Sequence, residues 1–276
     1  MAESFAARFA AARAARGPLV WGLDPSGKLL QDWGLGDTPE GLERFADLVL
    51  PVAAGTIGLV KPQSAFYERH GWRGLRTLAR LTEQARAAGL LVILDVKRGD
   101  VGSTNDAYAD AYLGQDAPLA ADAITVHPYL GLGAMGAFVS RAHESGGGLL
   151  VVTRSSNPEG RAVQAARSPA NTSTVEASLL LEIGQLNARL APGGIGPVGA
   201  VVAPATQLPA LPLASMNGLF LAPGVGAQGY TPQDVAATFA ACPDRVMPSA
   251  SRSLLAAGPD PARLRDTIAD LASQFR

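Results

Sequence analysis

Eight short apolar runs alternate with longer stretches of helical spacing along the 276 residues of this chain. The apolar runs are Leu19–Leu23, Thr56–Val60, Leu90–Leu94, Ala123–Val126, Leu149–Thr153, Val198–Ala203, Gly218–Ala222 and Arg245–Pro248. The helical stretches are Glu40–Ala53, Gly74–Ala88, Asn105–Gln115, Gly133–Glu144, Thr174–Leu190, Thr206–Ala214, Pro232–Ala241 and Pro261–Phe275. Strand–helix alternation indicates an α/β protein with a parallel sheet, and eight units close a (β/α)8 TIM barrel. A doubly wound open sheet is the alternative.

The chain length fits one such barrel, and no linker rich in Gly, Ser or charge divides it. We therefore expect residues 1–276 to form a single domain. Residues 1–16 are rich in Ala and Arg and predict a short amphipathic helix, with Ser4 as a possible cap, packed outside the barrel. The sixth helix is the weakest prediction, because Pro204, Pro209 and Pro212 interrupt it.

Composition excludes several classes of protein. Charged residues make up 17% of the chain and the net charge is −1, so no basic surface for nucleic acid is expected. The single cysteine, Cys242, excludes an internal disulfide framework and fits a reducing cytoplasm. No apolar run approaches the length of a membrane span, and the N-terminal residues lack a secretory pattern. We expect a cytoplasmic protein with a small-molecule substrate.

The third apolar run leads directly into a charged cluster, Asp95, Lys97 and Asp100. Asp95 and Lys97 are two residues apart, so in extended backbone they point to the same side, and Asp100 follows in a turn with Gly99 and Gly102. An ammonium held by two carboxylates can stabilise a developing carbanion and then donate a proton to it. The plainer alternative is a surface ion-pair cluster in which Asp100 or Thr104 caps the next helix.

In a barrel, catalytic residues lie at the carboxyl ends of the strands, and the polar residues of this chain follow that rule. They are Asp24, Lys61, Asp95, Lys97, His127, Arg154, Ser155, Ser156, Asn157, Gln228, Ser249, Ser251 and Arg252. The opposite strand ends carry Gly89, Gly148 and Gly199. Polar groups gathered at one rim favour an active site over a surface cluster, with Lys61 expected to pair with Asp95.

A glycine-rich loop, Pro223 to Tyr230, leaves the seventh strand, and Ser249, Ser251 and Arg252 follow the eighth. Glycines such as Gly226 let backbone N–H groups approach an anion, and Arg252 can donate two parallel hydrogen bonds. The loops after strands seven and eight often hold phosphate in barrels. These residues therefore predict a phosphate site. No spacing of His, Cys, Asp and Glu suggests a metal cage, although a single Mg²⁺ held by carboxylates stays an open alternative.

Several motifs together resemble orotidine 5′-phosphate decarboxylases, in the bacterial branch with the longer chain. The most specific is Asp95-x-Lys97-x-x-Asp100-x-x-x-Thr104. Three others support it: Lys61-Pro-Gln-Ser-Ala-Phe66, Ser156-Asn157-Pro158, and Pro223-Gly-Val-Gly-Ala-Gln228-Gly229. The first motif alone is shared with hexulose-phosphate synthase and ketogulonate-phosphate decarboxylase, relatives that use Mg²⁺. The combination with the other motifs and Arg252 favours the decarboxylase.

The resemblance implies metal-free, cofactor-free decarboxylation of orotidine 5′-phosphate to UMP and CO₂, the last step of de novo pyrimidine synthesis. It implies that Asp95 faces the departing carboxylate and that Lys97 protonates C6. It further implies the following contacts: ribose hydroxyls with Asp24 and Lys61, the pyrimidine edge with Ser156, and the phosphate with Gln228, Arg252 and the N–H groups of the loops around Gly226. Asp100 and Thr104 would reach into a neighbouring subunit's site, in a homodimer.

One departure from the family pattern, one residue without a role and two alternatives stay open. Tyr230 stands where the family often has a second Gly, and the resemblance gives no role to His127. The alternatives are a Mg²⁺-dependent sugar-phosphate lyase on the same barrel and a non-catalytic nucleotide-binding protein. Because phosphate binding can close loops over a substrate, we also expect the loops around Gln228 and Arg154–Asn171 to be mobile without ligand.

Overall fold

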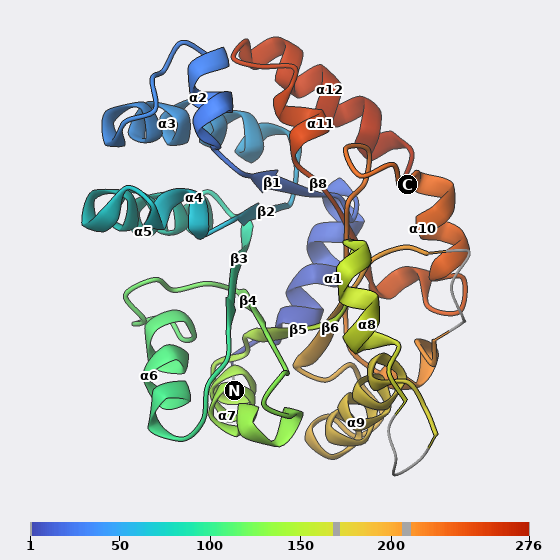
Figure 1. Ribbon diagram of the computed structural model, residues 1–276. Coiled ribbons are helices and arrows are strands. Elements are labelled where there is room, and N and C mark those ends of the chain that lie inside the picture. The colour runs from blue at the N-terminus through green and yellow to red at the C-terminus, as the bar shows by residue number, and fades with distance from the viewer. Residues whose placement is uncertain (1, 168–171, 206–210, 276) are drawn as a thin grey trace.

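The computed structural model describes residues 2–167, 172–205 and 211–275, and its core is a closed barrel of eight parallel strands (Figure 1). The strands are β1 Val20–Leu23, β2 Leu59–Pro62, β3 Leu91–Arg98, β4 Ala123–Val126, β5 Gly148–Arg154, β6 Val198–Val202, β7 Phe220–Pro223 and β8 Val246–Ala250. They pair in chain order, and β1 closes the barrel by pairing with β8, with Val20 opposite Ser249. The predicted TIM barrel is confirmed, and the open sheet is excluded.

Helices surround this barrel, and local capping sets where several of them begin. The longer helices are α1 Phe5–Arg16, α3 Pro39–Thr56, α5 Gly71–Ala87, α6 Ser103–Tyr112, α7 Gly136–Ser145, α9 Val175–Leu190, α10 Pro232–Thr238 and α12 Pro261–Ser273. Thr38, Thr174 and Asp260 accept hydrogen bonds from the first turns of α3, α9 and α12. Four short helices in the strand-to-helix loops were not predicted: α2 Gly27–Asp32, α4 Ala65–Glu68, α8 Arg161–Gln164 and α11 Arg252–Leu255. No helix in the described ranges is both long and apolar enough to cross a membrane.

Two predicted elements are corrected by the structure. The predicted second strand, Thr56–Val60, begins three residues too early, because Thr56 still belongs to α3 and β2 runs through Lys61. Of the predicted helix Thr206–Ala214, residues 206–210 lie outside the described part of the chain. The rest of it carries only a 3-10 turn, Ala214–Met216. Pro212, which lacks a donor N–H, precedes that turn.

The inward-facing side chains form two layers in the barrel. The lower layer, toward the amino ends of the strands, is apolar, and the upper layer, toward their carboxyl ends, is mixed. The lower cluster is buried and consists of Phe5, Phe9, Val20, Leu59, Leu91, Ile93, Ala123, Leu150, Val152, Val201, Leu219, Leu221 and Met247. Because side chains alternate along a strand, the residue two positions after an inward Leu or Ile also faces inward. This places Lys61 above Leu59, Asp95 above Ile93 and Thr125 above Ala123. The strand pattern thus carries polar groups to one end of the barrel.

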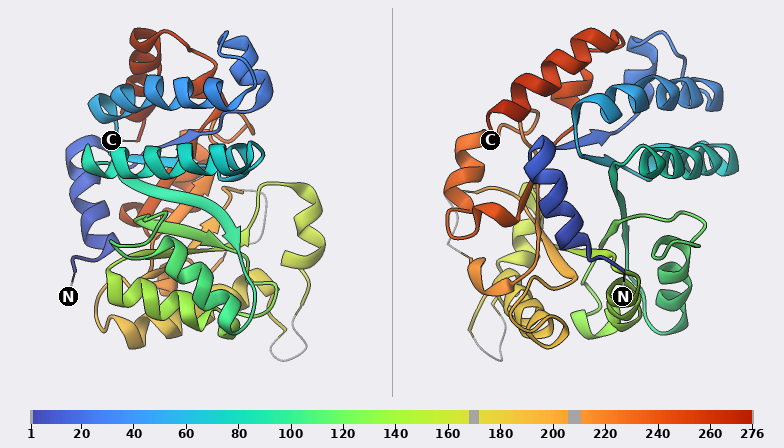
Figure 2. Two further views of the ribbon diagram at one scale, coloured as in Figure 1. Left: turned by 90° about the vertical axis from the view of Figure 1, so that its left-hand side faces the viewer. Right: turned by 180° about the vertical axis from the view of Figure 1, so that it is seen from behind.

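Helix α1 lies at the opposite end of the barrel from α8 (Figure 2). Ser4 caps α1, accepting a hydrogen bond from the Ala7 N–H, as the sequence predicted. Phe5 and Phe9 insert into the lower apolar cluster. Arg8 forms an ion pair with Asp122, whose other oxygen accepts a hydrogen bond from the Val92 N–H at 2.7 Å. The helix therefore closes the lower end of the barrel by both apolar and charged contacts.

We expect Asp122→Ala to lower the free energy of unfolding by about 3 kcal/mol, because it removes one partner of a buried ion pair. The Asp122 side chain is only 3% exposed, and its loss leaves both Arg8 and the Val92 N–H without this acceptor. Urea denaturation measures the change. Asp244→Ala is the control, since Asp244 pairs with Arg13 but is 79% exposed. Equal losses in the two variants would contradict the assignment.

Candidate active site

The carboxyl end of β3 is irregular at the charged cluster. Regular pairing with β4 continues up to Leu94, which lies opposite Ile124. It resumes only at Arg98, which lies opposite Val126. Lys97 has φ of +44°, a left-handed conformation that is uncommon for a residue with a side chain. Such strained conformations concentrate at functional sites, where the surrounding structure holds them. Asp95 and Lys97 are in contact as expected, but through a bulge rather than through regular extended backbone.

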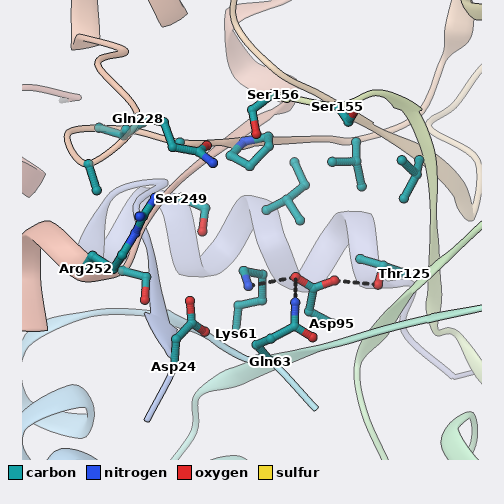
Figure 3. A pocket seen from close by; sticks show the side chains of 18 of the residues that line it. Asp24, Lys61, Gln63, Asp95, Thr125, Ser155, Ser156, Gln228, Ser249 and Arg252 are labelled. Atoms are coloured by element: carbon teal, nitrogen blue, oxygen red, sulfur yellow. Dashed lines mark hydrogen bonds and ion pairs between the residues drawn. The ribbon is translucent and has the colours of Figure 1, made fainter. Parts of the chain in front are cut away.

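Asp95 is held by several donor groups, and Figure 3 shows three of them, Lys61, Gln63 and Thr125. Its Oδ2 accepts hydrogen bonds from Lys61 Nζ at 2.9 Å and Gln63 Nε2 at 3.1 Å. Its Oδ1 accepts from Thr125 Oγ1 at 2.8 Å and contacts Lys97 Nζ. The predicted Lys61–Asp95 pair is therefore present. Four donors hold this carboxylate as an anion in a single orientation.

Charge and burial act in opposite directions on this pair. Burial disfavours ionised Asp95, but the ammonium groups of Lys61 and Lys97 outweigh it and hold the pKa of the Asp95 carboxyl well below its ordinary value. Burial likewise opposes the charge on Lys61, yet the carboxylates of Asp95 and Asp24 raise the pKa of its ammonium. Both residues are therefore ionised at neutral pH. Burial and the neighbouring Lys97 ammonium lower the pKa of His127, which favours the neutral imidazole.

Asp95 should make the stability of the protein depend on acid. Its folded-state pKa is depressed, so its stabilising contribution is complete above the unfolded value of 3.8 and is lost as pH falls below it. We expect the stability difference between wild type and Asp95→Asn to be constant from pH 7 to about 5 and to shrink below about pH 4. Urea denaturation at stepped pH measures it. A difference that grows on acidification would contradict this prediction.

The Lys61–Asp95–Lys97 cluster forms one wall of a cavity of about 240 Å³ at the carboxyl ends of the strands. Its lining residues are Asp24, Lys61, Gln63, Asp95, Lys97, Thr125, Val152, Ser155, Ser156, Val201, Leu221, Pro223, Gly224, Val225, Ala227, Gln228, Ser249, Ser251 and Arg252. Asp24, Lys61, Asp95 and Lys97 lie on or directly after β1 to β3, and Arg252 follows β8, whereas an apolar side comes from β5 to β7, namely Val152, Val201 and Leu221. A flat ring bearing one charged substituent fits such a division.

Arg252 and Gln228 line the cavity away from the Asp95 carboxylate (Figure 3). Arg252 is exposed, and its guanidinium has no ion-pair or hydrogen-bond partner within the described ranges. Gly224 has φ of +94°, and a Cβ there would lie 2.3 Å from Gln228 Oε1, so the turn requires glycine. The N–H of Gly226 donates to the Tyr230 carbonyl at 2.9 Å and Gly226 does not itself line the cavity. It therefore shapes the loop in this structure.

Asp24 follows β1 and lines the same cavity. Its Oδ1 is buried and has no hydrogen-bond partner among the described residues. A buried, unsatisfied carboxylate oxygen is costly unless a ligand supplies the missing donor. The structure thus has a vacant acceptor beside Lys61, whose ammonium is attracted to Asp24.

Asp100 and Thr104 do not line this cavity. Asp100 accepts a hydrogen bond from the Val101 N–H and makes no ion pair with Lys97 in this chain, so Lys97 contacts one carboxylate rather than the two expected. Nor does either residue cap α6, since its N-cap is Gly102, without a side-chain hydrogen bond. Lys97 is not fully desolvated, because 39% of its side chain is exposed.

Some residues of the loop after β5 line the cavity, whereas others stabilise the fold. Ser155 and Ser156 line the cavity, whereas Arg154 is buried against Glu176 at 2.7 and 3.0 Å. Arg161 also donates to Glu176, at 2.9 Å, which ties α8 to α9. Within the segment Arg154–Asn171, residues 168–171 lie outside the described part of the chain, and the expected mobility of this loop stays a prediction.

Sequence reasoning missed two polar contacts of Asp95 and the apolar wall. Gln63 stands out in the sequence only as part of the Lys61–Phe66 motif, and Thr125 lies inside the apolar run Ala123–Val126, where a lone threonine suggests core packing. The available signal was the period of two, which gives Thr125 the same orientation as Ala123. Val152, Val201 and Leu221 resemble ordinary strand residues and carry no such signal.

The chain is similar to proteins of one known family. The profile of the orotidine 5′-phosphate decarboxylase / HUMPS family matches residues 17–266. An orotidine 5′-phosphate decarboxylase of Salinispora arenicola is 50% identical over 263 residues, covering 95% of this chain and 94% of the relative. One from Streptomyces coelicolor is 46% identical over 275 residues, covering 99% of this chain and 98% of the relative.

Solved structures give the same result. The crystal structure of a Streptomyces avermitilis protein, described as an orotidine 5′-phosphate decarboxylase, aligns with a TM-score of 0.94 at 44% identity. It covers 100% of this chain and 95% of that one. The resemblance drawn from the Asp95–Thr104 motif is thereby confirmed. This chain belongs to the orotidine 5′-phosphate decarboxylase / HUMPS family.

Proposed function

We propose that the protein catalyses the metal-free decarboxylation of orotidine 5′-phosphate to UMP and CO₂, the last step of de novo pyrimidine synthesis. The observation that carries this proposal is the Lys61–Asp95–Lys97 cluster, placed in one cavity with an unpaired Arg252. Family membership and relatives that are 46–50% identical along nearly the whole chain support the same activity.

The reaction requires stabilisation of negative charge at C6 of the pyrimidine as CO₂ leaves. Lys97 supplies an ammonium beside that position and then donates the proton that replaces CO₂. Asp95 faces the departing carboxylate, and its low pKa keeps it anionic. It therefore repels the substrate carboxylate more than it repels the neutral CO₂ that forms. Lys61 fixes Asp95 from the other oxygen.

Other residues bind parts of the nucleotide remote from C6. We assign the ribose hydroxyls to Asp24 and Lys61, because Asp24 Oδ1 lacks a donor. Ser156 would contact the pyrimidine edge, and Gln228 and Arg252 would bind the phosphate, with Gly226 shaping the loop that carries Gln228. Binding energy from the phosphate can order these loops around the reacting ring.

We infer that the active unit is a homodimer in which Asp100 and Thr104 complete the partner's site. The loop that carries Asp100 is joined to the loop after β4, since the His127 N–H donates to the Arg98 carbonyl at 2.8 Å and Asn105 to the Ala134 carbonyl at 2.7 Å. Three large apolar side chains are exposed on these two loops: Val101 at 55%, Tyr129 at 84% and Leu130 at 52%. A second copy of the chain would cover them.

The decisive experiment follows the absorbance of orotidine 5′-phosphate in buffer containing EDTA. Loss of substrate absorbance with formation of UMP supports the proposal. Activity that disappears with chelator and returns with Mg²⁺ would indicate the sugar-phosphate lyase chemistry of related barrels instead. Binding without turnover would indicate a nucleotide-binding protein. We further propose that residues 1–276 act as one domain in the cytoplasm, where the buried Cys242 thiol stays reduced.

Arg252→Ala should lower kcat/KM about 10²-fold to 10³-fold, mainly by raising KM, since a charge-assisted bidentate contact to phosphate is lost. Steady-state kinetics with orotidine 5′-phosphate measure the change, and Arg265→Ala on the exposed face of α12 is the control. Orotidine without its phosphate should be turned over equally slowly by wild type and Arg252→Ala. A tenfold difference between them on orotidine would contradict the phosphate assignment.

A further inference from the structure

The hydroxyl of Thr125 connects both members of the Asp95–Lys97 pair. Thr125 lies on β4 and is 1% exposed. Its Oγ1 accepts a hydrogen bond from the backbone N–H of Lys97 at 3.0 Å and donates one to Asp95 Oδ1 at 2.8 Å. One side-chain oxygen therefore contacts both the main chain of Lys97 and the carboxylate of Asp95.

The strand pairing explains why such a link is needed. Between the pairs Leu94–Ile124 and Arg98–Val126, three residues of β3 lie opposite Thr125 alone. The ladder of backbone hydrogen bonds is interrupted there, so the Lys97 N–H bonds to the Thr125 side chain instead of a strand carbonyl. At the same residue φ is +44°, a conformation that persists only when surrounding contacts hold it.

We propose that Thr125 is a positioning residue of the decarboxylation reaction, whose hydroxyl holds the Lys97 backbone in its left-handed conformation while orienting the Asp95 carboxylate. This inference rests on the proposed function. Without the hydroxyl, the Lys97 N–H and Asp95 Oδ1 both lose a buried partner, and the bulge can relax toward ordinary strand geometry. The Lys97 ammonium would then move away from C6, while the residues assigned to the ribose and the phosphate stay unchanged.

The test compares three variants by steady-state kinetics. Thr125→Val keeps the shape and removes the hydroxyl, and kcat should fall about 10²-fold because small misplacement of a catalytic group has effects of that size. KM should stay near the wild-type value. Thr125→Ser restores the hydroxyl and should recover most of the lost activity. The matched control is Thr153→Val on β5, since Thr153 is equally buried but donates to the Val151 carbonyl at 3.1 Å and does not line the cavity.

A kcat of Thr125→Val near that of wild type, a loss confined to KM, or equal losses in Thr125→Ser would overturn the proposal. Crystal structures of wild type and Thr125→Val add a readout that does not depend on activity. We expect Lys97 to leave its positive φ, or its ammonium to leave Asp95, in the variant. An unchanged Lys97 would overturn the inference even with kcat reduced. Absence of turnover in wild type would instead reject the proposed function, and the two crystal structures would still decide the positioning role.

Discussion

Replacing Lys97 by Ala is expected to lower kcat by at least about 10⁴-fold, because the variant loses both a proton donor and the cation next to the developing charge. Removal of either function alone typically costs a factor of about 10² to 10³, and Lys97 performs both in the proposed reaction. Nucleotide affinity should change far less, since the phosphate and ribose contacts are untouched. Absorbance assays with long incubation times measure the residual kcat, and calorimetry of UMP binding measures the nucleotide affinity.

Lys97→Arg distinguishes charge from proton transfer. A guanidinium keeps the positive charge but does not release a proton near neutral pH, so this variant should also be nearly inactive. Lys28→Ala is the control, since Lys28 pairs with Asp32 on exposed α2 and its side chain is 82% exposed. A Lys97→Ala protein that retains a tenth of wild-type kcat would exclude Lys97 as the proton donor.

Mixing Lys97→Ala with Asp100→Asn protein should restore activity that neither variant has alone. If Asp100 acts in the partner's site, each mixed dimer has one site with both defects and one intact site. Random exchange at equal concentrations should then give about a quarter of wild-type activity, because half of the dimers are mixed and half of their sites are intact. Subunit exchange under mild denaturant, followed by the absorbance assay, measures the recovery.

The matched control mixes Lys97→Ala with Asp95→Asn. These two residues contact each other within one chain, so every site of a mixed dimer is defective and no activity should return. Differently tagged subunits demonstrate that mixed dimers have formed. Recovery in the control, or none in the Lys97/Asp100 mixture despite mixed dimers, would remove Asp100 from the partner's site. The fold would still place Asp100 where it is, outside the cavity of its own chain.

The fold and the location of the site were accessible from sequence because both follow from short-range patterns. Eight alternations of strand and helix leave few ways to bury every apolar face, and closure is the simplest one. The carboxyl ends of parallel strands then share one rim, so Asp24, Lys61, Asp95 and Arg252 had to meet there. The sequence also indicated the cap of α1, since Ser4 acts on the first turn of its own helix.

Other features depended on contacts between residues that are far apart in the sequence. Nothing local to Lys97 predicts its positive φ, because that conformation follows from three residues of β3 lying opposite Thr125 of β4. For the same reason Thr125 resembles a core residue in sequence and becomes a polar contact of Asp95 only in the barrel. Arg154 shows the reverse case: it belongs to the polar rim by position, yet Glu176 binds it inside the scaffold.

The sequence by itself therefore determined the barrel, its rim and the charged residues that the rim carries, because hydrophobic period and strand order are encoded along the chain. The tertiary structure alone decided which of those charges touch. Packing across the barrel sets the register between strands and the burial of the Asp95 carboxylate among its donors. It also sets the position of Asp100 outside the cavity of its own chain. The Lys61–Asp95 and Thr125–Asp95 contacts join residues about 30 positions apart, and no local pattern specifies them.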